Sequence, residues 1–148
     1  MITKVFFFIT FVYAIALFAD SPEKGTIIVE IEGFGNEKGI VFSHLYSEQL
    51  AEFFPTKSSK SYQKRIGRVD KRSATIVYEE IPYGTYALTV HHDEDENKRM
   101  NRNFIGYPTE GFGLSNNPTI FLSIPDFDEC KFELSKDTVV VKIKLKFV

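Results

Sequence analysis

The sequence predicts an all-β protein, in which seven or eight short antiparallel strands form one immunoglobulin-like β-sandwich behind an N-terminal signal peptide. Apolar and polar residues alternate along several short segments, as they do in strands with one buried face. Gly, Pro, Asn and Asp recur between these segments as turn formers. The first residues are apolar and are typical of an export signal. An up-and-down barrel built from the same strands is the alternative.

The N-terminus has the three parts of a secretory signal peptide. Lys4 precedes an uncharged, mostly apolar run at residues 5–19, whose 15 residues are fewer than the roughly 20 that a membrane-spanning helix needs. The run ends on a small residue that suits cleavage, and Ala14 with Ala16 offers an earlier cut. We therefore expect residues 1–19 to be removed, with an uncleaved membrane anchor as the alternative.

Cleavage there leaves one domain, residues 20–148, in the periplasm or the extracellular space and without a transmembrane span. A chain of this length can bury about two-thirds of its unfolded surface. Without Lys4, 17 basic and 20 acidic side chains remain, so the net charge is about −3. This balance argues against a nucleic acid or an anionic membrane as partner. Cys130 is the lone cysteine, which excludes an internal disulfide, and we expect it buried and inert at a strand start.

Two strands are predicted first. TIIVEIEG, residues 26–33, alternates with Ile27, Val29 and Ile31 on one side. After a turn-rich connector, IVFSHLY at residues 40–46 is apolar on both faces. Such a pattern is typical of a strand buried between two layers.

The segment from residue 47 to residue 72 is less regular. SEQLAEFF predicts a short helical turn or a rim loop that ends at Pro55. The polar and basic run after it predicts a loop or an edge strand around residues 62–69, since Lys and Arg blunt exposed sheet edges. We interpret its charge as a solvated face in preference to a binding patch.

Four more strands are predicted in the second half of the chain. Residues 75–81 form one, and PYG at 82–84 is a tight turn into the next. The strand after the turn has two alternating faces, one with Tyr86, Leu88, Val90 and His92 and the other with Thr85, Ala87, Thr89 and His91. KFEL and TVVVKIKLKF close the chain as the last two strands.

Residues 91–117 carry the candidate site. Asp93, Asp95 and Asn97 fall at positions 1, 3 and 5 of the calcium loop D-x-[DN]-x-[DN]-G-x5-E, and Asn101 falls at position 9. Oxygen ligands at alternate positions let a loop wrap one hard cation, because every second side chain turns inward. The sequence therefore predicts a weak calcium site, which would fill outside the cytoplasm. The expected ligands are Asp93, Asp95, Asn97, Asn101 and Glu110.

The loop departs from the calcium pattern at several positions. Position 12 is Phe104, so the usual Glu is missing, and Glu110 would have to fold back to supply it. Lys98 stands where a Gly is usual, and a left-handed turn there costs on the order of 1 kcal/mol. Lys98, Arg99 and Arg102 would also repel a cation. The alternative is an Asp-rich turn held by side-chain-to-backbone hydrogen bonds, without a metal.

The two histidines at the start of this stretch point to opposite faces of a strand, so His91 and His92 cannot chelate one ion together. We expect His92 to hydrogen-bond the loop that follows. The loop itself, residues 104–118, is rich in Gly and aromatics and long enough to be functional. It lacks the strand-then-helix context of a phosphate-binding Gly motif, which excludes a nucleotide site.

Three motifs resemble the secreted bacterial family called domain of unknown function 2141. They are PYGTYA at 82–87, HDEDENKRMN at 92–101 and GYPTEGFGLSNN at 106–117. The resemblance implies a small exported β-sandwich of the transthyretin or carboxypeptidase-regulatory kind. The usual Gly and the usual final Asp of the middle motif are Lys98 and Asn101 here. The family's motif maps to His92, Asp93, Asp95, Asn97, Glu110, Ser115 and Asn116.

These observations favour an exported, non-enzymatic binding or interaction module for an unidentified protein or envelope ligand. Its active surface would be the rim formed by residues 91–117, organised by calcium. The alternative is a hydrolase that uses Glu110, Asp93 or His92 as acid or base, which requires environments that separate their pKa values. A third possibility is an envelope component that binds another protein by its sheet edge.

Overall fold

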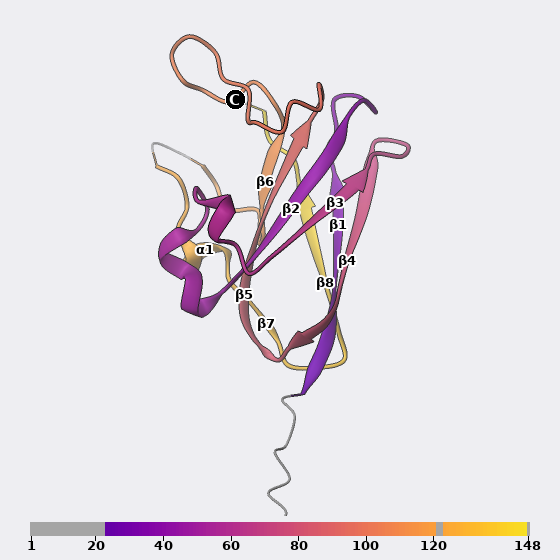
Figure 1. Ribbon diagram of the computed structural model, residues 1–148, viewed down its shortest axis with the longest axis vertical. Coiled ribbons are helices and arrows are strands. Elements are labelled where there is room, and N and C mark those ends of the chain that lie inside the picture. The colour runs from indigo at the N-terminus through magenta and orange to yellow at the C-terminus, as the bar shows by residue number, and fades with distance from the viewer. Residues whose placement is uncertain (1–22, 121–122, 148) are drawn as a thin grey trace, which may run out of the picture.

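The computed structural model describes residues 23–120 and 123–147, which form a mostly β protein with eight strands in two sheets (Figure 1). The three-stranded sheet has the order β4-β1-β8, and the five-stranded sheet has the order β3-β2-β5-β6 with β7 paired to β5. The strands are β1 (Lys24–Glu32), β2 (Ile40–Ser47), β3 (Gln63–Arg68), β4 (Ser73–Pro82), β5 (Gly84–Asp93), β6 (Phe112–Leu114), β7 (Phe132–Leu134) and β8 (Thr138–Lys144). The predicted two-layer β architecture is confirmed.

One strand pair differs from the predicted antiparallel sandwich. β8 runs parallel to β1, with Thr26 beside Thr138 and Glu32 beside Lys144, while the other strand pairs are antiparallel. Alternation along a strand fixes which face is buried but carries no information on strand direction. The chain reaches β8 from β7 in the opposite sheet, so no hairpin joins β8 to β1 and requires the pair to be antiparallel.

The main core fills the space between the two sheets. The inward residues of β1, β4 and β8 face those of β2 and β5. Each fully buried aliphatic side chain stabilises the fold by about 1.5–3 kcal/mol. Those that are almost completely excluded from solvent include Ile27, Val29, Ile31, Val41, Leu45, Tyr78, Ile81, Leu88, Val90, Leu134 and Ile143. The two alternating faces that the sequence predicted for β1 and β5 are confirmed by this packing.

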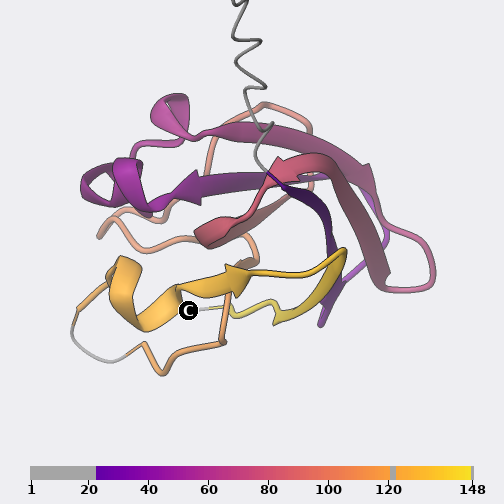
Figure 2. The ribbon, with the colours of Figure 1, turned by 90° about the horizontal axis from the view of Figure 1, so that it is seen from below.

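The five-stranded sheet is also covered on its outer face. The 3-10 helix η1 (Glu48–Phe53) and the short helix α1 (Phe127–Cys130) lie on the same side of the molecule (Figures 1 and 2). A second 3-10 turn, η2 (Ser58–Lys60), follows η1. The second apolar cluster beneath them contains Tyr46, Phe54, Ala87, Leu114, Phe127 and Cys130. A second buried face explains why the sequence of β2 is apolar on both sides.

Cys130 ends α1, so the expectation of a strand start there was wrong, although the residue is buried as expected. The N-cap Asp126 accepts a hydrogen bond from the Glu129 backbone, and the Glu129 side chain accepts one from the Asp126 backbone. This capping box ends the chain's extended run and starts a helical turn. Burial raises the pKa of the Cys130 thiol to about 12.

The PYG segment has a different role from a hairpin turn. β4 ends at Pro82 in one sheet and β5 begins at Gly84 in the other, so these residues carry the chain between the layers. The Tyr83 N–H donates to the Glu23 carbonyl 2.8 Å away, which ties the crossing to the residue before β1. β3 lies at the edge of its sheet, as its basic sequence predicted.

Both sheets and both apolar clusters of the described part of the chain lie within residues 24–147, inside the range predicted for the domain, residues 20–148. The predicted signal peptide, residues 1–19, lies outside the described residues. Among the residues that are described, no helix has the length and apolar character needed to span a bilayer.

Candidate functional site

The loop between β5 and β6 leaves and re-enters the sheet at adjacent points. β5 pairs with β6 from Thr89–Leu114 to His91–Phe112, and the His92 N–H donates to the Gly111 carbonyl 2.8 Å away. This pairing brings the residue before Gly111 beside the end of β5. Glu110 therefore returns to the start of the loop, as it must in order to replace the Glu that is missing at position 12 of the calcium pattern.

Three carboxylates converge at this point. Asp93, Asp95 and Glu110 each offer one oxygen, and these oxygens lie within 4.8 Å of one another. Asp93 and Glu110 are buried, whereas Asp95 is exposed. Calcium binds oxygen at 2.3–2.6 Å, so two oxygens on one ion lie up to about 5 Å apart. The geometry can thus hold one cation between all three side chains.

The Asp93 side chain shapes the turn that follows it. Its Oδ1 accepts the Asn97 N–H at 3.2 Å and its Oδ2 accepts the Lys98 N–H at 2.8 Å. Glu96 and Lys98 both have positive φ, 57° and 64°. Lys98 therefore adopts the left-handed conformation for which the calcium loop uses Gly, and the Asp93 hydrogen bonds offset a cost of roughly 1–2 kcal/mol.

Glu110 connects three parts of the loop base. Its Oε1 accepts the Glu94 N–H at 3.1 Å, and its Oε2 accepts the Asn101 N–H at 2.9 Å. The same Oε2 lies 2.9 Å from His91 Nε2. The structure therefore contains the side-chain-to-backbone turn that was the alternative to a metal loop, and the carboxylates that form this turn are the ones that converge.

The side-chain amides of Asn97 and Asn101 both hydrogen-bond Asp95. Both Nδ2 groups donate to Asp95 Oδ2, at 2.8 and 2.9 Å. The Asn97 Oδ1 accepts from the Arg99 backbone, and the Asn101 Oδ1 accepts from Asn97. The donation from Asn101 holds the pKa of the Asp95 carboxyl below its usual value. These two amides position Asp95 and favour its ionised form, and their own oxygens accept hydrogen bonds within the loop.

His92 is fully buried and contacts the connector before β2. Its Nε2 donates to the Lys38 carbonyl 2.7 Å away, and its ring packs edge-on against Phe34 with 4.9 Å between centroids. The partner of the His92 side chain therefore precedes β2, and the prediction of a partner in the following loop was wrong. The reason is register, since Ile40 at the start of β2 pairs with Asp93 at the end of β5.

Ser115 and Asn116, the other motif residues, lie beyond the carboxylates. The buried Ser115 hydroxyl accepts the Leu88 N–H at 2.9 Å and donates to the Cys130 carbonyl at 2.6 Å. Asn116 has a positive φ of 64° and donates through Nδ2 to the Lys131 carbonyl at 2.8 Å. Both residues fasten the end of β6 to α1.

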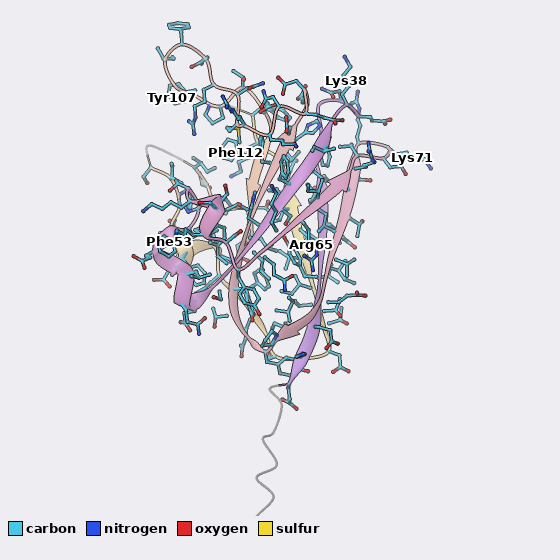
Figure 3. All side chains as sticks on the ribbon, in the orientation of Figure 1. Lys38, Phe53, Arg65, Lys71, Tyr107 and Phe112 are labelled. Carbon is cyan, nitrogen blue, oxygen red and sulfur yellow. The ribbon has the colours of Figure 1, made fainter. Side chains whose placement is uncertain are left out.

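Sequence reasoning missed two features of this region. His91 is the direct partner of Glu110, and only the β5–β6 register could have placed the two together. The loop also carries exposed apolar side chains at its far end, where Figure 3 places Tyr107. The alternation of apolar residues, which identified the strands, gives no signal for a loop that extends away from them.

The residues of the hydrolase alternative line neither of two surface hollows in the described part of the chain. One hollow of about 350 Å³ lies between the end of β2 and the start of β5, beside Tyr62 and Tyr83. The other, of about 310 Å³, lies on the three-stranded sheet beside Glu30 and Lys142. Glu110, Asp93 and His92 are instead buried and held by the hydrogen bonds described above.

Comparison with known proteins gives one structural match and one family. A crystal structure of a fimbrial assembly protein from Parabacteroides distasonis matches with a TM-score of 0.45 and 6% identity, over 86% of this chain and 54% of that one. The chain thus spans about half the length of that protein. No curated protein sequence matches the chain. The family described as "Uncharacterized protein conserved in bacteria (DUF2141)" matches residues 29–142, and the chain belongs to this family.

Proposed function

We propose that the chain is an exported, non-enzymatic interaction module whose loop at residues 91–117 is organised by one calcium ion. The observation that carries this proposal is the convergence of Asp93, Asp95 and Glu110, whose oxygens lie within 4.8 Å of one another. In the described part of the chain, His91 is the one basic side chain paired with this group. Buried charges require partners, and a divalent cation would offset the remaining negative charge.

The donor set favours calcium over other metals. All three ligands are carboxylate oxygens, which suit hard cations, whereas zinc and copper prefer nitrogen or sulfur. Asp95 is exposed and Asp93 is buried, so an ion between them would keep one side toward water. Calcium accepts six to eight ligands in flexible geometry, including water, while magnesium demands a near-ideal octahedron. The loop therefore supplies a partial shell that water would complete.

The position of the cluster supports an interaction role in preference to catalysis. The carboxylates lie at the base of the loop, and their hydrogen bonds fix the backbone from Glu94 to Asn101. The rest of the loop extends beyond the sandwich (Figure 1). A cation at the base would stiffen this extension and set its direction. Export, expected from residues 1–19, would bring the loop into calcium concentrations that fill a site with a dissociation constant of roughly 10⁻⁴ to 10⁻³ M.

The test is a calcium titration of residues 20–148 followed by melting temperature and calorimetry. At about ten times the dissociation constant, binding stabilises the fold by roughly 1.4 kcal/mol, which raises the melting temperature by roughly 5 °C. Asp95→Asn should remove this shift and change the calcium-free melting temperature little, because Asp95 is exposed. Glu96→Gln is the matched control, since Glu96 is an exposed neighbour outside the cluster.

Two results would contradict the proposal. The first is a melting temperature that does not move at millimolar calcium. The second is an equal loss of the shift in Glu96→Gln and Asp95→Asn, which would indicate a diffuse charge effect instead of a site. Magnesium at the same concentration provides the selectivity control.

A further inference from the structure

The far end of the β5–β6 loop is a small, preformed turn, here called the tip and defined as residues 103–107. The Asn103 Oδ1 accepts the N–H groups of Ile105 and Tyr107, at 3.1 and 3.0 Å. The Asn103 backbone adds two further bonds, to the Tyr107 carbonyl at 2.9 Å and from the Gly106 N–H at 3.0 Å. One side chain therefore fixes the conformation of the whole tip.

The tip exposes large apolar side chains to solvent. Phe104 is 97% exposed, Ile105 is 64% exposed and Tyr107 is 53% exposed. The loop projects away from the end of the sandwich, with Tyr107 on its extended part (Figures 1 and 3). A turn built on Asn103 needs none of these apolar groups for its own stability. Clustered exposed apolar side chains of this kind mark a contact surface.

The charge around the tip is positive, in contrast to the loop base. Residues 97–109 contain Lys98, Arg99 and Arg102 and no acidic residue. All three basic side chains are exposed, and the Arg102 Nη1 donates to the Gly106 carbonyl at 2.8 Å, directly behind the tip. The net charge of −2 for the whole chain therefore conceals a local charge of opposite sign.

We propose that the tip inserts into an anionic lipid surface. Phe104 and Ile105 would enter the boundary of the acyl chains, Tyr107 would lie at the headgroup level, and the basic residues behind them would contact lipid phosphates. Aromatic side chains favour this interface, and each nearby Lys or Arg adds attraction to an anionic leaflet. The proposal names the partner of the interaction function argued above and rests on that function, although not on the calcium ion.

The size and shape of the tip favour lipid over a protein partner. A specific protein interface takes about 800 Å² from each partner, far more than three side chains on a projecting turn provide. Insertion into a lipid surface needs no complementary cavity, and a small apolar wedge with flanking positive charge is sufficient. The whole-chain net charge argued against an anionic membrane, but the charge that meets the surface is that of residues 97–109.

Vesicle flotation of residues 20–148 tests the proposal. We expect flotation with phosphatidylcholine vesicles that contain phosphatidylglycerol, and at least about tenfold weaker binding for the double variant Phe104→Ser with Ile105→Ser. The matched control is Val77→Ser with Val140→Ser, because these residues are 42% and 48% exposed on the three-stranded sheet. Arg99→Gln with Arg102→Gln should remove the preference for anionic vesicles.

A fluorescence measurement gives a second readout of insertion. The chain has no Trp, so Phe104→Trp places a single reporter on the tip. Its emission should shift to shorter wavelength with anionic vesicles, because the indole leaves water. The emission of Val77→Trp should not shift, since that face of the sheet stays in water.

Each negative result has a distinct meaning. Absence of flotation, or equal flotation of the tip variant and the wild type, overturns lipid docking. A dimer in sedimentation that the tip variant loses would also overturn it and assign the tip to a second copy of the chain. Flotation measured in calcium and in chelator separates the two proposals: a calcium melting shift without flotation retains only the cation site, and flotation without the shift retains only lipid docking.

Discussion

His91 Nε2 lies 2.9 Å from Glu110 Oε2, and both side chains are largely shielded from solvent. The two residues belong to β5 and to the return of the loop toward β6, so this contact closes the loop at its base. The same Glu110 carboxylate also receives the backbone N–H groups of Glu94 and Asn101. A carboxylate with this many donors acts as an anchor whether or not a cation is bound.

Glu110 has two roles that mutation can separate, because it holds the loop base by hydrogen bonds and is also a proposed calcium ligand. Glu110→Gln should abolish the calcium response and should also lower the stability of the calcium-free protein by about 1–3 kcal/mol, because three partly buried donors lose a charged acceptor. Asp95→Asn, by contrast, should affect the calcium response alone. Urea unfolding of both variants, in calcium and in chelator, measures the difference. Equal calcium-free stability of the wild type and Glu110→Gln would contradict the anchoring role.

The second prediction concerns the close approach of Gly39 to the loop base. A Cβ on Gly39 would lie 2.0 Å from the Asp93 carbonyl oxygen, and its φ is +71°. Gly39→Ala should therefore destabilise the protein by more than about 2 kcal/mol and displace the first residue of the cluster. Gly106→Ala is the control, because its φ is +90° and no atom lies within 4 Å. Gly106→Ala should lose only the roughly 1 kcal/mol that a left-handed backbone conformation costs an alanine.

Denaturant midpoints and the calcium melting shift together check this prediction. Gly39→Ala should lose stability and calcium response, while Gly106→Ala should retain the response. A Gly39→Ala protein as stable as Gly106→Ala would show that the connector can move away from Asp93 without consequence.

The third prediction is a pH dependence that originates at His44. Burial first, and then the charges of Lys64 and His91, lower the pKa of His44 from 6.5 to about 4. The folded protein thus holds this ring neutral, and the unfolded chain binds the proton more readily. The neutral His44 ring therefore costs no stability above pH 6.5, and the free energy of unfolding decreases as the pH falls from 6.5 toward 4. The loss between about pH 7 and about pH 5 is about 2 kcal/mol.

Urea unfolding at several pH values, on the wild type and His44→Gln, measures this contribution. The free energy of unfolding of the wild type should decrease relative to that of His44→Gln as the pH falls from about 7 to about 5. Comparing the two proteins cancels the titration of the carboxylates that they share. Parallel stability curves for the two proteins would contradict the assignment to His44.

Much of the fold was predictable because alternation records burial. The two faces of β1, β2 and β5 follow directly from their sequences, and the edge position of β3 follows from its Lys and Arg. The direction of β8 and the helical turn before Cys130 were not predictable from this pattern. Parallel pairing depends on a crossing between sheets, and α1 depends on a four-residue capping box inside a segment that reads as a strand start.

The candidate site, like the fold, was predictable only in part. Spacing alone placed Asp93 and Asp95 in one turn, and Glu110 was expected to fold back to them, which the β5–β6 register brings about. Spacing could not show that the Asn97 and Asn101 oxygens bond within the loop. It also could not show that His92 contacts the connector at Lys38, because that contact depends on the pairing of β2 with β5. Side-chain direction in a loop depends on hydrogen bonds that a linear motif does not encode.

Ser115 belongs to the family motif but should stabilise the fold without affecting the carboxylates Asp93, Asp95 and Glu110. Ser115→Ala leaves the buried Leu88 N–H and the Cys130 carbonyl without their hydroxyl partner, which should cost about 1–3 kcal/mol. The calcium melting shift should remain, because the Ser115 hydroxyl bonds Leu88 and Cys130 and none of the three carboxylates. Ser61→Ala is the control, since its hydroxyl makes a comparable bond at an exposed position, to the Ser58 carbonyl at 2.8 Å, and should cost less than about 0.5 kcal/mol. Loss of the calcium shift in Ser115→Ala would mean that the end of β6 and the loop base act as one unit.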